Sequence, residues 1–69
     1  MKITNANSFG KAIKDRRKAL GYTQQELSDF CGMSTSFLSN LENGKETCEI
    51  GKAMYIASIL GLDLFLEER

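Results

Sequence analysis

Residues 23–45, TQQELSDFCGMSTSFLSNLENGK, predict two short helices joined by a tight turn. Thr23, followed three residues later by Glu26, has the pattern of a capping box, in which each side chain bonds the other residue's backbone N–H. The helix that begins there is expected to end at Gly32, because glycine adopts the left-handed conformation of a helix C-terminus without a steric penalty. Ser34 is the predicted N-cap of the second helix.

The two predicted helices depend on packing for their stability. Each has about eight residues, and isolated helices shorter than about 12 to 15 residues are marginal in water. The second helix ends at Asn43-Gly44. The residues expected to face the core are Leu27, Phe30 and Cys31 of the first helix and Leu38 and Leu41 of the second.

Helices are also predicted on both sides of this stretch. The periodicity before it indicates a helix from about Phe9 to Leu20, with Ser8 as its N-cap and Gly21 after its end. Residues 50–60, IGKAMYIASIL, predict a fourth helix that Gly61 ends. Its expected buried positions are Ile50, Met54, Ile56, Ala57 and Ile59 or Leu60.

The segment after the fourth helix predicts a short strand over residues 62–67. A single strand needs a partner, and the chain contains no other strand candidate, so the expected partner is the same segment of a second copy. The fold expected for residues 1–69 is one all-α domain: a four-helix bundle over 9–61, a helix-turn-helix motif at about 23–43, and the strand. The residues predicted to form the dimer contact are Leu62, Leu64, Phe65 and Leu66.

Composition excludes several function classes. The chain has two cysteines and no histidine, so we expect no metal site and no cofactor, with Cys31 and Cys48 as small buried apolar residues. The same lack of histidine, with no glycine-rich phosphate loop, argues against an enzyme. No apolar run reaches the length of a membrane span and no targeting segment is visible, so a cytoplasmic protein is expected.

The charges are unevenly distributed, although the chain has no net charge. Residues 1–45 hold seven basic and four acidic residues, whereas residues 46–69 hold two basic and five acidic ones. Nucleic-acid-binding proteins usually carry a basic surface. The first part of the chain is therefore the candidate for contact with DNA.

The second short helix has uncharged polar residues at the positions that do not face the core. Ser, Thr and Asn side chains can bond base edges; Asn40 could pair with adenine, and Phe37 could contact a thymine methyl group. Gln24, at the start of the preceding helix, suits a phosphate oxygen, and Lys14 and Lys45 add positive charge. The alternative interpretation is that a serine-rich short helix only provides caps and turns.

The run from Gly21 to Lys45 closely resembles the helix-turn-helix of the lambdoid-repressor and Cro class, also called the Xre family. The resemblance implies a helical bundle that binds a palindromic operator as a dimer. It also implies that Arg17 pairs with Glu42 to tie the bundle together. The matching residues are Gly21, Thr23, Gln24, Glu26, Leu27, Gly32, Ser34, Leu38 and Leu41 to Lys45. The implied DNA contacts are phosphate for Gln24 and Asn43, bases for Thr35, Ser36 and Asn40, and the groove for Phe37.

The apolar C-terminal segment resembles that of the HipB-type antitoxins within this family. That resemblance implies paired C-terminal strands, repression of the protein's own operon, and binding to a HipA-like kinase toxin. Two alternatives stay open: a stand-alone repressor of a phage or mobile element, and a protein-interaction module that does not bind DNA. Short polar side chains favour DNA over the interaction module, because they make weak interface anchors compared with Trp, Tyr or Arg.

Overall fold

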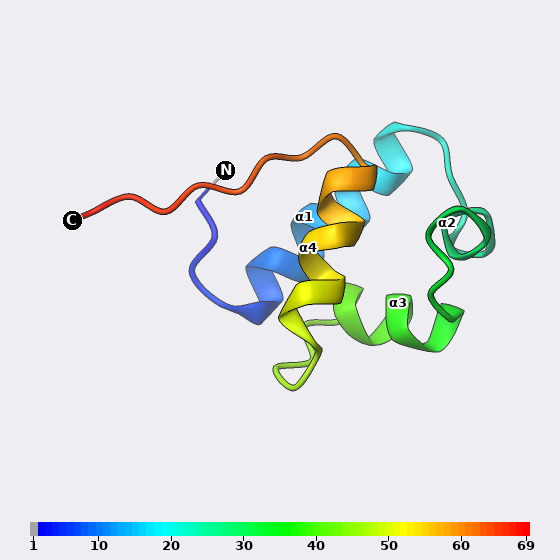
Figure 1. Cartoon of the computed structure of the whole chain (residues 1–69), viewed down its shortest axis with the longest axis horizontal. Helices are drawn as coiled ribbons and strands as arrows, with labels where there is room; N and C mark the ends of the chain where they lie inside the picture. Colours follow the sequence, from blue (N-terminus) through cyan, green and yellow to red (C-terminus); the bar gives the residue numbers. More distant parts are fainter. Residues whose placement is uncertain (1) are drawn as a thin grey trace.

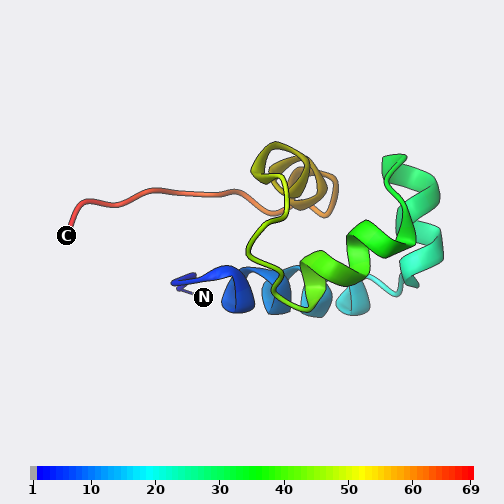
Figure 2. The same ribbon diagram turned by 90° about the horizontal axis from the view of Figure 1, so that it is seen from below.

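The structure, a computed structural model that describes residues 2–69, contains four helices. They are α1 (Ala6–Ala19), α2 (Gln24–Cys31), α3 (Thr35–Glu42) and α4 (Ile50–Ile59). α3 packs against both α1 and α2, and α4 lies across α1 with its first turn near α3 (Figures 1 and 2). The prediction of an all-α, four-helix domain is confirmed. Within residues 2–69 no helix has the length and apolar character needed to cross a bilayer.

α1 begins three residues earlier than the sequence pattern predicts. Its N-cap is Asn5, whose side chain accepts a hydrogen bond of 2.8 Å from the backbone N–H of Ser8. The Ser8 hydroxyl in turn accepts from the backbone N–H of Asn5 at 3.1 Å. The prediction of Ser8 as N-cap is therefore wrong: this serine is the third helical residue, where it completes a capping box that begins at asparagine.

The two short helices form as predicted. Thr23 and Glu26 make the reciprocal capping box at the start of α2. Gly32 ends α2 with φ +73°, in the left-handed region where a side chain would be strained. The Ser34 hydroxyl accepts a 3.1 Å hydrogen bond from the backbone N–H of Phe37 and caps α3.

The core lies where all four helices meet. Its fully buried large side chains are Ile13, Leu27, Leu38, Ile56 and Leu60. Three predicted core positions are wrong. Phe30 is 62% exposed, because Leu27 and Cys31, one turn apart, form the buried stripe of α2. Ile50 and Met54 are 73% and 48% exposed, because α4 turns its small residues Ala53 and Ala57 toward the core instead.

α1 and α3 approach closely at Gly10. A Cβ atom at this position would lie 2.2 Å from the backbone oxygen of Leu41, closer than such atoms can come. Gly10 therefore lets the two helix backbones meet, and this contact places the C-terminal end of α3 directly against α1. Figure 2 shows α3 running beside α1.

Residues 62–69 extend away from the helices without a paired strand (Figure 1). Arg16 of α1 donates a 2.8 Å hydrogen bond from Nε to the backbone oxygen of Leu60 and holds the point where the segment leaves α4. Within the single chain the predicted strand is absent, because nothing in residues 2–69 offers it a neighbouring edge. Its pairing with a second copy stays a prediction.

Candidate nucleic-acid interface

α3 has one anchored side and one free side. Leu38 and Leu41 are 0% and 5% exposed and hold the helix in the core. On the other side, Ser36 and Asn40 are exposed, and Thr35 is half-buried. The structure thus gathers three of the predicted base-contacting residues on the helix surface that is free to enter a groove. No hydrogen bond within residues 2–69 involves the side chain of Ser36 or Asn40.

Phe37, the fourth predicted base-contacting residue, lies at the edge of this surface. It is half-buried and packs against the core, so its ring is fixed more firmly than an exposed side chain would be. The Lys52 ammonium of α4 lies 5.9 Å from the centre of the ring, within the range of a cation–π contact. The same ammonium lies 2.9 Å from a carboxylate oxygen of Glu49.

Lys52 is the charged residue near α3 that the sequence analysis missed. It belongs to the acidic part of the chain and stands 15 positions after Phe37 in the sequence. Only the folding of α4 beside α3 brings the two together. No signal in the sequence could have placed this lysine next to the candidate interface.

The predicted phosphate-contacting residues divide into two groups. The first group lies near Glu42. It consists of Gln24, the first residue of α2, and Lys14 of α1, whose positive charge helps to lower the pKa of Glu42. Asn43 and Lys45 follow α3 and are exposed. The Asn43 side-chain amide donates a 3.3 Å hydrogen bond to the Ser39 hydroxyl, which keeps it beside the free side of α3.

A buried ion pair joins α1 to the end of α3. Arg17 Nε lies 2.7 Å from Glu42 Oε2 and Arg17 Nη2 lies 2.9 Å from Oε1, a bidentate arrangement. The two side chains are 8% and 2% exposed. Arg17 also donates to the backbone oxygen of Tyr22 at 2.8 Å, and Gln24 donates to Glu42 at 3.1 Å. The pair that the family resemblance implied therefore lies in contact and carries its own hydrogen-bond network.

The pKa values of both groups are shifted in the direction that keeps them charged. Burial alone would raise the pKa of Glu42, but hydrogen bonds from Arg17 and Gln24 and the positive charges of Arg17 and Lys14 bring it below its usual value. The hydrogen bond to Glu42 raises the pKa of Arg17, against the opposing effect of burial. Arg17 of α1 and Gln24 of α2 both donate to the carboxylate of Glu42 at the end of α3, so the network fixes the two short helices relative to each other and to α1.

Comparison with known proteins identifies the class. The family model described as Helix-turn-helix matches residues 13–65. The chain is 35% identical over 62 residues to the ImmF control region 10 kDa protein of Bacillus phage phi105, covering 90% of this chain and 69% of that one. It is 51% identical over 38 residues to the competence pilus inhibition repressor of Acinetobacter baylyi, 55% of this chain but only 34% of that repressor.

Solved structures show the same fold. A structure described as a HipB-O4 20mer complex matches with a TM-score of 0.88 and 28% identity, over 99% of this chain and 96% of that one. A structure of a HipA-HipB-O2-O3 complex matches with the same score, identity and coverage. The chain belongs to the helix-turn-helix family of DNA-binding transcriptional regulators, of the Xre type. This is a family of regulators rather than of enzymes.

Proposed function

We propose that this protein is a sequence-specific transcriptional repressor that binds a palindromic operator as a dimer. The observation that carries the proposal is the form of α3: Leu38 and Leu41 anchor it in the core, while Ser36 and Asn40 are free on its outer side. A firmly held helix with uncharged hydrogen-bonding side chains suits the major groove, where each base pair presents a distinct set of donors and acceptors.

The proposed DNA contacts are of two kinds, to the bases and to the phosphate backbone. Thr35, Ser36, Phe37 and Asn40 contact base edges and methyl groups. The groups around them contact the phosphate backbone and position α3 without selecting a sequence. These are Gln24, Asn43, Lys45 and Lys14. The Arg17–Glu42 pair is structural and makes no contact with DNA.

Dimerisation places two copies of α3 on one face of the operator. Successive major grooves on that face are about 34 Å apart, so a two-fold axis must set this spacing. We propose that the extended residues 62–67 pair with those of a second copy, because the apolar side chains of Phe65 and Leu66 are 82% and 105% exposed in the single chain. Leu62 and Leu64 complete the apolar segment.

The more specific proposal is a HipB-like antitoxin that represses its own operon and binds a HipA-like kinase toxin. The similar structures support it, since one is described as a complex of HipB with an O4 20mer and another as a complex of HipA and HipB with O2 and O3. The similarity to the phage phi105 protein supports the second candidate, a stand-alone repressor of a phage or mobile element. Co-expression with the product of the adjacent gene separates the two: a stable complex with a kinase-like protein identifies the antitoxin.

The decisive experiment measures mass and DNA binding together. Light scattering gives the mass of the protein in solution, and fluorescence anisotropy follows its titration onto DNA from upstream of its own gene, at two salt concentrations. We expect a dimer that binds this DNA far more tightly than a shuffled sequence, with the preference kept as salt rises. Equal affinity for both sequences would contradict the proposed repressor.

A further inference from the structure

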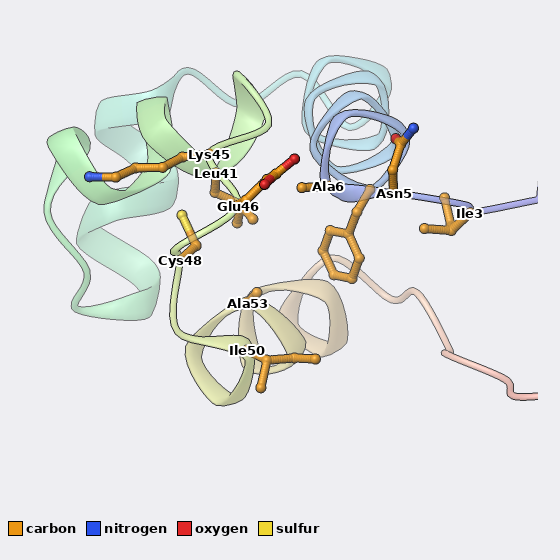
Figure 3. A pocket seen from close by; sticks show the side chains of 10 residues that line it. Ile3, Asn5, Ala6, Leu41, Lys45, Glu46, Cys48, Ile50 and Ala53 are labelled. Atoms are coloured by element: carbon orange, nitrogen blue, oxygen red, sulfur yellow. The ribbon is translucent and has the colours of Figure 1, made fainter.

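Four large apolar side chains form one exposed surface along α4 and the two terminal segments. Ile3, Ile50, Met54 and Leu64 are 39%, 73%, 48% and 45% exposed. Ile3 and Ile50 line a cavity of about 300 Å³ beside the start of α4, which Figure 3 shows. Ile3 and Leu64 line a smaller cavity between α1, α4 and the C-terminal segment. Met54 follows Ile50 by one turn, about 40° around the helix axis. These four residues make up the α4 flank surface.

The α4 flank surface lies on the side of α4 away from the candidate DNA interface. Lys52 marks the side that faces α3, because its ammonium lies 5.9 Å from the centre of the Phe37 ring. Met54 stands two residues later, about 200° further around a helix of 3.6 residues per turn. A protein bound to the α4 flank surface would therefore leave α3 free to contact DNA.

Paired C-terminal segments alone would make a weak dimer contact. Residues 62–67 of two copies would form a two-stranded sheet, which is marginally stable in water unless a third element packs on it. Stable complexes bury about 800 Å² on each partner. The dimer of the proposed function therefore needs a second contact, and Leu64 joins the C-terminal segment directly to the α4 flank surface.

The charges beside the α4 flank surface suit contact with an identical copy. Its four side chains are uncharged, and the two charged residues that line the adjoining cavity, Lys45 and Glu46, are of opposite sign. Two copies of one surface repel each other across a two-fold axis when that surface carries a net charge. The opposite charges of Lys45 and Glu46 avoid this repulsion.

We propose that the same surface of a second copy covers the α4 flank surface, so that Ile3, Ile50 and Met54 of the two chains meet beside their paired C-terminal segments. The contact rests on the dimer of the proposed function and adds a helical surface to it. A two-fold axis brings one patch of each chain against the same patch of the other, as this contact requires. It removes from water the side chains of Ile50 and Met54, which the single chain leaves exposed.

Met54 and its neighbour Tyr55 give a matched pair of variants. The two residues are 48% and 50% exposed, but Tyr55 lies about 100° away around α4, outside the α4 flank surface. Light scattering over a range of concentrations gives the dissociation constant of the dimer. Met54→Lys should raise this constant by about tenfold or more, because the dimer would bury unpaired ammonium groups. Tyr55→Lys should leave it within about twofold of the value for the unmodified chain.

Two results would overturn the proposal. Equal weakening by Met54→Lys and Tyr55→Lys would show that the contact is not confined to one side of α4. An unchanged dissociation constant for Met54→Lys would leave the α4 flank surface to a different protein. Circular dichroism checks that each variant is folded. If Met54→Lys unfolds, Ile50→Lys repeats the test at a residue that is 73% exposed.

Leu66→Lys separates this inference from the proposed dimer. The variant places a charge in the C-terminal segment, outside the α4 flank surface, and should weaken a dimer that the paired segments hold. If it does so while Met54→Lys has no effect, the α4 contact is overturned and the paired segments stand. An unmodified chain that is a monomer at every concentration overturns both. Operator binding by the unmodified chain tests the repressor independently of these results.

Discussion

The α2–α3 motif and the α4–tail region of this small protein are organised by different kinds of information. In the motif, Thr23, Gly32 and Ser34 each act within four residues of where they stand, through caps and a left-handed turn. In α4 and the tail, the apolar residues Ile50, Met54 and Phe65 point to solvent. Local hydrogen bonds specify the α2–α3 motif. In the α4–tail region, by contrast, packing against the other helices decides which side chains are buried.

The largest effect expected from this comparison concerns the ion pair that holds the motif to α1. Glu42→Ala leaves the Arg17 guanidinium buried with only the backbone oxygen of Tyr22 as an acceptor. Removing one partner of a buried pair typically costs about 3 to 5 kcal/mol in the free energy of unfolding. Urea denaturation followed by circular dichroism measures the loss.

The matched control removes an exposed ion pair from α1. Lys11 and Asp15 lie 3.0 Å apart with side chains 71% and 50% exposed, so Asp15→Ala should cost less than about 1 kcal/mol. Equal losses for the two variants would show that the buried pair adds nothing beyond a surface one, and the account of how the motif is held would fail.

The second prediction tests the two sides of α4. Ile56 is 0% exposed and Ile50 is 73% exposed. Ile56→Ala should lower the free energy of unfolding by about 2 to 5 kcal/mol through lost burial and a cavity. Ile50→Ala, measured in dilute protein where the chain is monomeric, should change it by no more than about 0.5 kcal/mol. Thermal denaturation of both variants measures the two losses. A larger loss for Ile50→Ala than for Ile56→Ala would contradict the structure.

These two sides of α4 show where sequence-based prediction stops. The apolar periodicity located the helix, but Ile50 and Met54 fit a buried stripe as well as Ala53 and Ala57 do. Which of the two pairs is buried depends on how closely α4 approaches the other helices, because small residues at the contact let helices pack closely. Lys52 beside Phe37 is a similar case, since it depends on the crossing of α4 and α3.

The candidate interface was more predictable than the core, because its signals are local. Ser36 stands two residues before Leu38, and Asn40 stands between Leu38 and Leu41, in a pattern that leaves one side of a helix polar; the structure exposes both. The partner of Arg17 is different. Glu42 lies 25 residues away, and only the family resemblance pointed to it.

The third prediction uses pH to examine the same buried carboxylate. The pKa of Glu42 is lower in the folded protein than the value of about 4.3 for an unfolded chain. Its contribution to stability is therefore complete above the unfolded pKa and is lost as pH falls through the folded pKa. Urea denaturation across this acid range should show a weaker pH dependence for Glu42→Gln than for the unmodified chain. A Glu68→Gln control, which changes an exposed carboxylate of the tail, should retain the full dependence. An unchanged slope for Glu42→Gln would show that the ion pair does not couple folding to protonation.

The fourth prediction separates base contacts from phosphate contacts within the motif. Asn40→Ala should weaken operator binding by about 1 to 3 kcal/mol and relax the preference for one base pair. Gln24→Ala should weaken binding to operator and random DNA alike, because a phosphate contact carries no sequence information. Anisotropy titrations with a set of single-base operator variants distinguish the two. If Asn40→Ala weakened all sequences equally, the assignment of α3 as the base-contacting helix would have to be withdrawn.

The smallest expected effect tests whether local caps alone specify the motif. Thr23→Ala removes the hydroxyl that accepts from the backbone N–H of Glu26 at 3.1 Å, and the loss of such a cap typically costs about 1 kcal/mol. Thr23→Ser keeps the hydroxyl and should restore most of the stability.

Because Gln24 begins α2 and donates a hydrogen bond to Glu42, fraying of the first turn of α2 should also weaken this hydrogen bond to the Glu42 carboxylate. Amide hydrogen exchange at the first turn of α2 measures this directly: faster exchange in Thr23→Ala but not in Thr23→Ser would tie the cap to the motif. Unchanged exchange in both would mean that packing against α3, rather than the cap, fixes the start of α2, and the contrast between the two regions would then disappear.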